Sequence, residues 1–327
     1  MSAARPELAR HLSEAFPRSR LDPLAGDAST RRFYRLVLAD GGTAVVMDYG
    51  APFAGLTDDV RLTRVFQDAG LRVAEILDVV PGVGCLILED LGDRTLEREV
   101  GDRQAAGRDL EPVYLPAVDL AVDLAERGTA ALSRSERVFG PALDEARFRF
   151  EMEFFLEQFA TAHLKLGEIP DAARRQAWAL AAEAAATPRR VLCHRDYHSR
   201  NLMLLGNGSL AMVDIQDARW GPDTYDLASL VCDAYVDLDP GAPERWIESY
   251  RTALRDRPAR DGFEERFAVV ALERMVKALG TFGYQAEVLG RRSYLNAVPR
   301  TVRRIRGLRE RLPRYAALID LLDSASV

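Results

Sequence analysis

Apolar and polar residues follow two different patterns along this chain, and the pattern changes near residue 110. In the first part, short apolar runs alternate with polar residues between Gly- and Pro-containing turns, which predicts antiparallel strands. We expect strands at 32–38, 43–48 and 84–89 and one helix at 58–69. In the second part, apolar residues recur every three or four positions, as on the buried face of a helix. This spacing predicts helices at 114–132, 147–164, 171–186, 224–238, 243–255, 262–283 and 299–322.

The order of these elements predicts an α+β protein with a small antiparallel β-rich N-lobe and a mainly helical C-lobe. With 327 residues the chain is long enough for two such lobes. The segment from Glu89 to Gly92 passes from a buried strand into a glycine-containing connection, so we expect domains at 1–90 and 91–327. The polar stretch 101–107 is expected to be mobile.

The balance of acidic and basic residues bears on whether the protein binds nucleic acid or membranes. Acidic residues outnumber basic residues by 50 to 44 and are spread along the chain, which gives no case for binding nucleic acid or an anionic membrane. The exception is 291–314, which holds nine arginines at the spacing of an amphipathic helix. A solvated basic face is the expected role of this segment. Attraction of an acidic substrate, such as a lactyl carboxylate, and weak nucleic-acid contact are the alternatives.

Cysteine usage and hydropathy predict a cytoplasmic location. Cys85, Cys193 and Cys232 are far apart and flanked by apolar residues, as buried reduced thiols are. Charged residues interrupt the N-terminal region where a secretory signal would need an apolar run, and no stretch of about 18 apolar residues occurs.

Residues 191–214, VLCHRDYHSRNLMLLGNGSLAMVD, space three polar side chains as phosphoryl transfer requires. Asp196 and Asn201 are five positions apart, and Asp214 follows after thirteen more. Apolar runs around a Gly-rich turn predict a hairpin that returns Asp214 to the loop of Asp196. In a kinase-type site the first Asp accepts the proton of the substrate hydroxyl, while the Asn and second Asp hold magnesium. We therefore expect Asp196 to be the catalytic base and Asn201 and Asp214 to be Mg²⁺ ligands.

HRDYHSRNLML at 194–204, followed by VDIQDARWGPDTYDLASL at 213–230, resembles the catalytic core of the aminoglycoside phosphotransferase-like kinases, relatives of the protein kinases. Three further segments resemble one branch of that superfamily, the bacterial N-acetylmuramate/N-acetylglucosamine anomeric kinases of cell-wall recycling. These segments are GDASTRRFYRL at 26–36, LILEDLGDRTL at 86–96 and QDARWGPDTYDL at 216–227.

The resemblance implies a bilobal protein-kinase-like fold that uses ATP and Mg²⁺. It also implies that His194 is a structural residue, which supports the catalytic loop through Asp226. A catalytic role for His194 is the competing interpretation. His198 lies in the same loop and is interpreted either as a substrate contact or as a solvated residue.

The segment expected to bind the nucleotide phosphates departs from better-known members of this superfamily. In those proteins a Gly-rich loop covers the phosphates and a lysine of the third strand binds them. Here the corresponding loop has one glycine, and no lysine occurs before residue 165. We expect Arg31 or Arg32 to contact phosphate, with Asp27 and Ser29 in the same nucleotide-binding loop. The branch resembled here has similar residues at these places, so the departure does not by itself indicate an inactive protein.

The adenine is expected to pair with backbone groups of Glu89 to Leu91, the connection between the two lobes. Because these contacts use the backbone, the sequence does not distinguish ATP from GTP, and ATP is favoured by the resemblance. Sugar hydroxyls need acceptors such as carboxylates and amides. The candidate substrate residues near Asp196 are Arg200, Gln216, Asp217, Tyr225, Glu151 and Glu153.

These observations favour a kinase, expected to be a monomer, that phosphorylates the anomeric hydroxyl of N-acetylmuramate or N-acetylglucosamine. A kinase for another small alcohol, such as an aminoglycoside, choline, homoserine or another hexose, is the alternative enzyme. The absent lysine leaves a non-catalytic nucleotide-binding protein as the alternative from another class.

Overall fold

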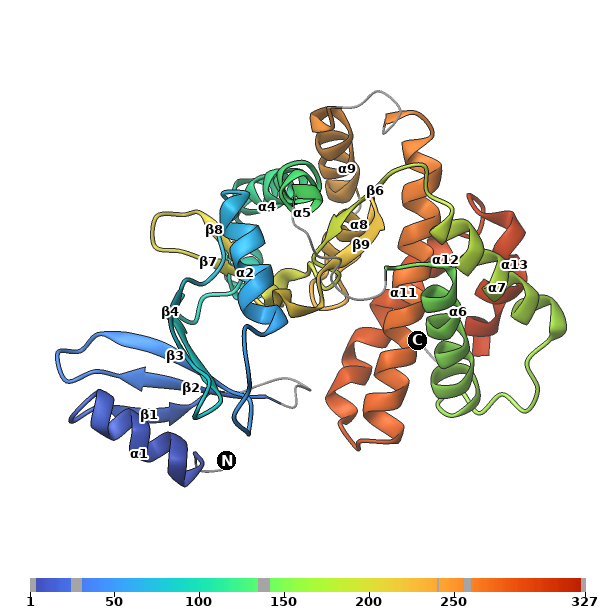
Figure 1. Ribbon diagram of the computed structural model, residues 1–327. Helices are drawn as coiled ribbons and strands as arrows, with labels where there is room; N and C mark the ends of the chain where they lie inside the picture. Colours follow the sequence, from blue (N-terminus) through green and yellow to red (C-terminus); the bar gives the residue numbers. More distant parts are fainter. Residues whose placement is uncertain (1–3, 25–30, 135–141, 240, 256–259, 325–327) are drawn as a thin grey trace. The chain divides into compact units, whose positions relative to one another are not determined.

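The computed structural model describes residues 4–24, 31–134, 142–239, 241–255 and 260–324 (Figure 1). The chain forms two compact units. The first unit consists of Met1–Arg94 and Met203–Gln216, and the second consists of Thr95–Leu202 and Asp217–Val327. The antiparallel sheet of the N-terminal region and the helices of the C-terminal region confirm the predicted α+β class.

A five-stranded antiparallel sheet in the order β1-β2-β3-β5-β4 forms the centre of the first unit. Alternate side chains of the strands point to opposite faces, and each face carries an apolar cluster. Tyr34 and Leu36 pack with Leu8 and Leu12 of the first helix, while Met47 packs with the second helix. The elements are α1 (Pro6–Ala15), β1 (Arg20–Pro23), β2 (Arg32–Val37), β3 (Thr43–Asp48), α2 (Asp58–Asp68), β4 (Ile76–Val80) and β5 (Cys85–Glu89).

The predicted strands and helix of this unit correspond to β2, β3, β5 and α2, whereas α1, β1 and β4 have no counterpart in the prediction. Only Leu8 and Leu12 of α1 are buried, and β4 has an irregular register between Ile76 and Asp78. Such short or interrupted patterns give little periodicity for a sequence argument to use.

A hairpin from the middle of the chain completes the first unit. Its strands are β7 (Leu202–Leu204) and β8 (Leu210–Met212). The Met212 backbone N–H donates to the Arg72 carbonyl over 2.9 Å, and the Leu204 N–H donates to the Arg94 carbonyl over 2.7 Å. These backbone hydrogen bonds attach the hairpin to a segment more than a hundred residues earlier in the chain.

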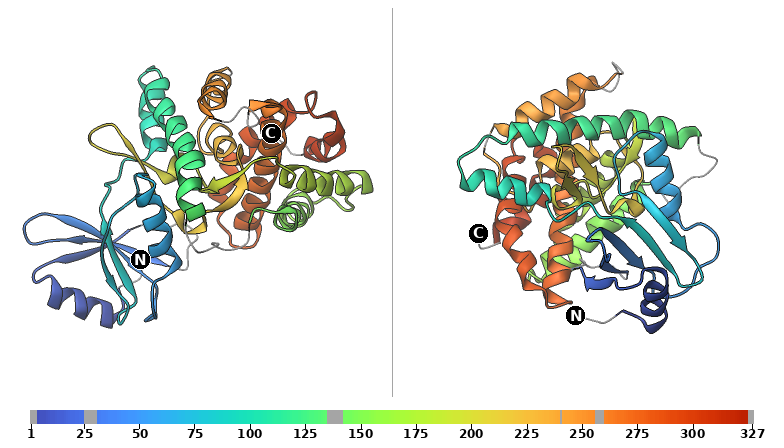
Figure 2. Two further views of the ribbon diagram at one scale, coloured as in Figure 1. Left: turned by 45° about the horizontal axis from the view of Figure 1, so that its top comes forward. Right: turned by 90° about the vertical axis from the view of Figure 1, so that its left-hand side faces the viewer.

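The second unit is mainly helical, and its longest helix, α11 (Phe263–Glu287), is largely buried. Helix α6 (Glu145–Phe155) and the π-helical turn Leu156–Thr161 lie along α11 (Figures 1 and 2). The other α-helices are α3 (Leu96–Ala105), α4 (Glu111–Asp123), α5 (Thr129–Arg134), α7 (Asp171–Ala185), α8 (Tyr225–Val231), α9 (Ala242–Ala253), α12 (Val298–Gly307) and α13 (Ala316–Asp320).

Much of the polar stretch 101–107 is helical, because α3 continues to Ala105 after Thr95 caps its first turn. One expectation for this unit is corrected. The predicted helix 299–322 is interrupted, because α12 ends at Gly307 and α13 begins at Ala316, after Pro313. Proline removes a backbone donor and crowds the preceding turn, so a helix seldom continues through it.

The small sheet of β6 (Arg190–Cys193) and β9 (Arg219–Pro222) belongs to the second unit, and β6 leads directly into the loop that holds Asp196. The three cysteines are free thiols, as expected, and two of them are buried. Within the described part of the chain, no helix has both the length and the apolar character of a membrane span.

Replacing Gly283 of α11 by alanine is expected to destabilise the second unit. A Cβ atom there would overlap the carbonyl of Gln158, which is backbone and cannot swing away. Overpacking of this kind costs about 1–3 kcal/mol. Gly101→Ala, inside α3, is the matched control: its Cβ would meet open space, and the helix propensity of alanine should stabilise by up to about 1 kcal/mol. Denaturant unfolding of both variants measures the difference, and equal stability would contradict the packing argument.

Candidate active site

The catalytic loop, residues 194–201, leaves β6 through a sharp turn that a buried carboxylate holds in place. The backbone N–H of His194 donates to Asp226 Oδ2 over 2.7 Å, and that of Arg195 donates to Asp226 Oδ1 over 3.0 Å. Arg195 has a φ of 81°, which is unusual for a residue other than glycine. Burial raises the pKa of Asp226, and the two N–H groups oppose that shift. Asp226, near the start of α8, therefore positions the beginning of the loop.

The predicted interaction between His194 and Asp226 therefore includes a hydrogen bond from the backbone N–H of His194. The imidazole is fully buried and lies edge-on to the Tyr197 ring, with the ring centres 5.8 Å apart. The Tyr197 hydroxyl donates to the Ala117 carbonyl over 2.7 Å. These contacts place His194 in the interior behind the loop, where a supporting role is the natural one.

A second buried carboxylate, Asp233, holds the other half of the loop and was not singled out from the sequence. Asp233 Oδ2 accepts from the Ser199 backbone N–H and Oδ1 from that of Tyr235, both over 2.8 Å. The side chain is 2% exposed. Because Asp233 follows the end of α8, one short helix carries at its two ends both carboxylates that hold the loop.

Two arginines of the basic C-terminal segment hold the residues that follow α8. Arg304 donates to the carbonyls of Asp233 and Val236, and Arg300 donates to that of Ala234 over 2.7 Å. The expectation of a solvated basic face is therefore wrong for these two side chains. Arginine has five N–H donors in a fixed fork, which lets one side chain satisfy two carbonyl groups at once.

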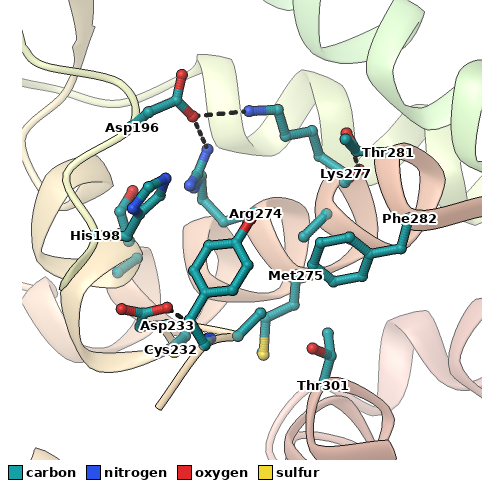
Figure 3. Close-up of a pocket in the computed structure, with 15 residues that line it drawn as sticks. Asp196, His198, Cys232, Asp233, Arg274, Met275, Lys277, Thr281, Phe282 and Thr301 are labelled. Atoms are coloured by element: carbon teal, nitrogen blue, oxygen red, sulfur yellow. Dashed lines mark hydrogen bonds and ion pairs between the residues drawn. The ribbon is translucent and has the colours of Figure 1, made fainter. Parts of the chain in front are cut away.

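Asp196 lies in this loop with its carboxylate close to two cations of α11 (Figure 3). Lys277 Nζ is 3.3 Å from Asp196 Oδ1, and Arg274 Nη1 is 3.7 Å from the same oxygen. Burial alone would raise the pKa of Asp196, but the charges of Lys277 and Arg274 outweigh it and hold the pKa far below its ordinary value. Asp196 is therefore an anion and a weak base, suited to orienting a hydroxyl rather than to removing its proton early.

Asn201 is fixed beside Asp196, since its Nδ2 donates to the Asp196 carbonyl over 2.9 Å. This contact uses the amide nitrogen and leaves Oδ1 as an acceptor. Asp214 belongs to the first unit, has a φ of 64°, and accepts a hydrogen bond from the Gln216 side chain. An amide oxygen and a carboxylate are the hard donors that Mg²⁺ prefers, so both residues fit the predicted metal role.

A pocket of about 100 Å³ opens beside Asp196 within the second unit. Lys277, Arg274 and Asp196 lie on one side of it, with His198 next to them (Figure 3). Burial lowers the pKa of His198, whose ring lies edge-on to Tyr235. The other lining residues are Ala228, Ser229, Cys232, Asp233, Ala234, Tyr235, Met275, Ala278, Thr281, Phe282 and Thr301.

Several of the predicted substrate residues are engaged elsewhere. Arg200 Nε lies 3.1 Å from the carboxylate of Glu97, and its guanidinium stacks 3.6 Å over the Tyr235 ring centre. Tyr225 is fully buried and accepts a hydrogen bond from Arg274 over 3.0 Å. Both residues thus support groups that line the pocket.

Three more predicted substrate residues also have partners. Asp217, half exposed, lies 3.4 Å from Arg195 and 3.0 Å from Arg219. Gln216 belongs to the first unit and contacts Asp214. Glu153 accepts hydrogen bonds from Arg174 and Trp178.

Glu151, the remaining candidate, forms a buried acid pair with Glu273 of α11. Glu151 Oε1 accepts from Arg147 Nε over 2.9 Å and lies 3.7 Å from Arg195. Burial would raise the pKa of Glu151, but Lys277 and Arg147 lower it below its ordinary value. Burial, together with the charge of Glu151, raises the pKa of Glu273 well above its ordinary value. Glu273 is therefore protonated under conditions in which Glu151 is ionised.

The nucleotide-binding residues predicted for the first unit are only partly described. Asp27 and Ser29 lie outside the described residues. Arg31 Nη1 is 2.9 Å from Asp59 Oδ1, and its guanidinium lies 5.2 Å from the Tyr49 ring centre.

The other predicted nucleotide contacts lie in strands or at their ends. Arg32 is paired with Asp48 in the register of β2 and β3, and Arg5 of the N-terminal segment forms an ion pair with the Asp48 carboxylate at 2.5 Å. Glu89 is paired with Arg72 at 2.5 Å, and this hydrogen-bonded ion pair lowers the pKa of Glu89. Leu91 lies just beyond the end of β5.

Comparison with known proteins agrees with this geometry. Residues 20–263 match the model of the family described as "Phosphotransferase enzyme family". The chain belongs to this family. It is therefore a phosphotransferase, and the family resemblance seen in the sequence is confirmed.

Two similar curated proteins are both named N-acetylmuramate/N-acetylglucosamine kinase. The protein from Pseudomonas aeruginosa is 30% identical over 316 residues, which cover 94% of this chain and 89% of the relative. The protein from Neisseria meningitidis is 26% identical over 311 residues, covering 91% and 89%.

Solved structures share the fold of this phosphotransferase at low identity. Choline kinase LicA from Streptococcus pneumoniae superposes with a TM-score of 0.62 at 15% identity, covering 93% of this chain and 98% of LicA. Aminoglycoside-3'-phosphotransferase of type VIII gives 0.54 at 16% identity, covering 83% and 97%.

Sequence reasoning missed Lys277, Arg274 and Asp233. One signal was present for Lys277: of the 44 basic residues in this phosphotransferase, only Lys165 and Lys277 are lysines. A lysine inside an apolar helix of such an arginine-rich chain is unusual. Nothing in the sequence, however, indicates that it lies against Asp196.

Asp233→Asn is expected to lower kcat/KM by about 10²-fold, because displacing a catalytic loop by an ångström has that order of effect. The amide keeps one acceptor but points an NH₂ group at a backbone N–H, which also costs about 1–3 kcal/mol of stability. Asp237→Asn, at an exposed position four residues later, is the matched control and should behave like the wild type. Steady-state kinetics and denaturant unfolding measure both effects. Wild-type activity in Asp233→Asn would refute the positioning role.

Glu273→Gln is expected to become more stable relative to the wild type as pH rises. Because the folded-state pKa of Glu273 is raised, its contribution to stability is complete below the ordinary carboxyl pKa and is lost as pH rises through the folded pKa. The difference should grow by about 1.4 kcal/mol per pH unit in that interval. Unfolding curves between pH 5 and 8 test this. A flat difference for Glu273→Gln would mean that the carboxyl of Glu273 is ionised in the fold.

Proposed function

We propose that this phosphotransferase moves the γ-phosphoryl group of ATP to the anomeric hydroxyl of an amino sugar, N-acetylmuramate or N-acetylglucosamine, and releases the sugar 1-phosphate. The observation that carries the proposal is the nearly full-length match to proteins named as kinases of these two sugars. The use of ATP makes the cytoplasm the expected location, and sugar recovery during cell-wall recycling the expected process.

The chemistry of Asp196 supports an anomeric acceptor. The neighbouring cations lower the pKa of Asp196 and so make it a weak base. The anomeric hydroxyl is the most acidic hydroxyl of a sugar because the ring oxygen withdraws electron density from the same carbon. A weak base that mainly orients its partner suits such an acceptor, since the phosphoryl-transfer transition state is loose and needs little early deprotonation.

Asn201 and Asp214 are the residues that would hold Mg²⁺, through Oδ1 and the carboxylate respectively. When bound, Mg²⁺ would neutralise the negative charge of the nucleotide phosphates. Asn201 can present its oxygen because its nitrogen is held by the Asp196 carbonyl. Asp196, for its part, receives the acceptor hydroxyl at the pocket.

The pocket electrostatics disfavour a cationic acceptor such as choline or an aminoglycoside. The charged groups beside Asp196 are Lys277 and Arg274, and the Asp233 carboxylate already accepts two backbone N–H groups. A polycation needs several free carboxylates. A neutral or acidic sugar therefore fits this part of the second unit better.

The decisive test is turnover of N-acetylmuramate, N-acetylglucosamine, glucose, galactose, choline and kanamycin with ATP and Mg²⁺, followed by phosphorus NMR of the products. We expect a sugar 1-phosphate from an N-acetylated amino sugar. Asp196→Asn should lose about 10²–10⁴-fold in kcat, the usual contribution of a general base. Turnover of choline or kanamycin alone, or a phosphate on another hydroxyl, would overturn the proposed acceptor. Full activity in Asp196→Asn would overturn the proposed base.

A further inference from the structure

We propose that Lys277 is a catalytic residue that binds the transferring phosphoryl group, in place of the lysine that the first unit lacks. The inference rests on the proposed function and assigns to α11 a part in the transfer step. It concerns the charge of the transition state rather than the binding of the nucleotide.

A cation is needed because the phosphoryl group carries negative charge over three oxygens during transfer. The first unit has no lysine in its sequence. Among its described arginines, six form ion pairs with carboxylates, and neutralised arginines are poor phosphate ligands unless they first break those pairs. The six pairs are Arg5–Asp48, Arg20–Asp22, Arg31–Asp59, Arg35–Asp90, Arg61–Asp58 and Arg72–Glu89.

The position of Lys277 follows from its contact with Asp196. A catalytic base lies within about 2.6–3.2 Å of the hydroxyl oxygen it serves. That hydroxyl oxygen forms the new bond to phosphorus. The phosphoryl oxygens are bonded to the same phosphorus, so they lie close to the hydroxyl oxygen during transfer. Because Lys277 Nζ is 3.3 Å from Asp196 Oδ1, the ammonium group is close to where those oxygens must pass.

Lys277 also has donors to spare. An ammonium group has three N–H donors, and the contact with Asp196, at the long end of the hydrogen-bond range, uses one of them. Its side chain is 17% exposed and lines the pocket, so a substrate can reach it. Arg274, in contrast, is held from the other side by the Tyr225 hydroxyl and ring.

Charged groups of both signs face Lys277. Asp196 and Arg195 come from the catalytic loop, Arg274 and Glu273 from α11, and Glu151 from α6. Burial, with the charges of Arg274 and Arg195, lowers the pKa of Lys277 below its ordinary value, and the carboxylates of Asp196 and Glu151 oppose that shift.

The choice of lysine in a chain so rich in arginine agrees with this role. Arginine offers a planar fork that suits a fixed carboxylate, whereas lysine offers a compact charge on a flexible stem. A compact charge can keep its contact with Asp196 while it follows the phosphoryl oxygens. A buried guanidinium at this place would be tied more rigidly to the carboxylates around it.

The step balances without a further reactant. The acceptor oxygen forms a bond to the γ-phosphorus, and the bond from that phosphorus to the β,γ-bridging oxygen breaks, with its electron pair leaving on ADP. The hydroxyl proton passes to Asp196. Lys277 keeps all its protons and donates hydrogen bonds to the phosphoryl oxygens.

The test compares Lys277→Met, Lys277→Gln and Lys277→Arg with Lys165→Met, which removes the other lysine, whose ammonium donates to the Ala162 carbonyl. We expect kcat to fall about 10²–10³-fold in the Met and Gln variants, as for loss of one preorganised donor to a developing charge. The KM for ATP and for the sugar should change by less than about 3-fold, because the contact forms mainly in the transition state. Lys277→Arg should recover at least about 10-fold over Lys277→Met, and Lys165→Met should match the wild type.

A binding measurement separates this role from a structural one. Calorimetry with ADP and Mg²⁺ should give the same affinity for the wild type and for Lys277→Gln. Addition of aluminium fluoride and the sugar, which together mimic the phosphoryl in transfer, should tighten ADP binding at least about 10-fold more in the wild type than in the variant. If Lys277→Met fails to fold, Lys277→Gln and Lys277→Arg decide the matter.

Three results would overturn the proposal. They are a kcat within about 3-fold of the wild type in Lys277→Gln, a rise in sugar KM with unchanged kcat, and equal tightening by aluminium fluoride in both proteins. The second would make Lys277 a ligand for the acceptor, such as its carboxylate. If the wild type acts on an alcohol other than an amino sugar, the proposed function is wrong. Loss of kcat with that alcohol in the Lys277 variants would then still support the role of Lys277.

Discussion

The active-site region of this phosphotransferase depends on hydrogen bonds from backbone N–H groups of the loop 194–201 to buried carboxylates. Asp226 and Asp233 each accept two backbone N–H groups, one pair at the start of the catalytic loop and one that includes Ser199 near its end. The two carboxylates therefore fix the backbone at both ends of the segment that holds Asp196. Within that segment, the side chain of Asn201 adds a hydrogen bond to the Asp196 carbonyl.

Helix α11 connects the stability of the second unit to its chemistry. Its glycines allow the backbone of α6 and of the following π-helical turn to approach closely, which buries one side of the helix. Arg274 and Lys277 project toward Asp196, while Glu273 is buried with Glu151. Packing fixes the rotation of the helix, and that rotation places the two cations at the Asp196 carboxylate. A change in the packing of α11 should therefore affect the charge around Asp196 as well as the stability.

The arginines of this chain mostly serve structure. In the first unit they pair with acids around the sheet, and in α12 two of them hold the backbone that follows α8. This explains why a strongly basic C-terminal segment need not mark a nucleic-acid surface. Lys277, in contrast, lies beside Asp196 and lines the pocket.

The sequence by itself determined the α+β class, strands β2, β3 and β5, helix α2, the position of the catalytic loop and the phosphotransferase family. It could do so because local periodicity decides which face of an element is buried, and because the spacing from Asp196 to Asn201 to Asp214 is itself set by the chemistry. The site roles of these residues remain predictions. Only the tertiary structure decided that the β7–β8 hairpin pairs with the backbone near Arg72, that Asp226 holds backbone groups of the loop, and that Lys277 reaches Asp196 from 81 positions away. Such contacts depend on how helices and strands that are distant in the sequence pack together. A local pattern of apolar and polar residues does not show which polar groups will then be neighbours.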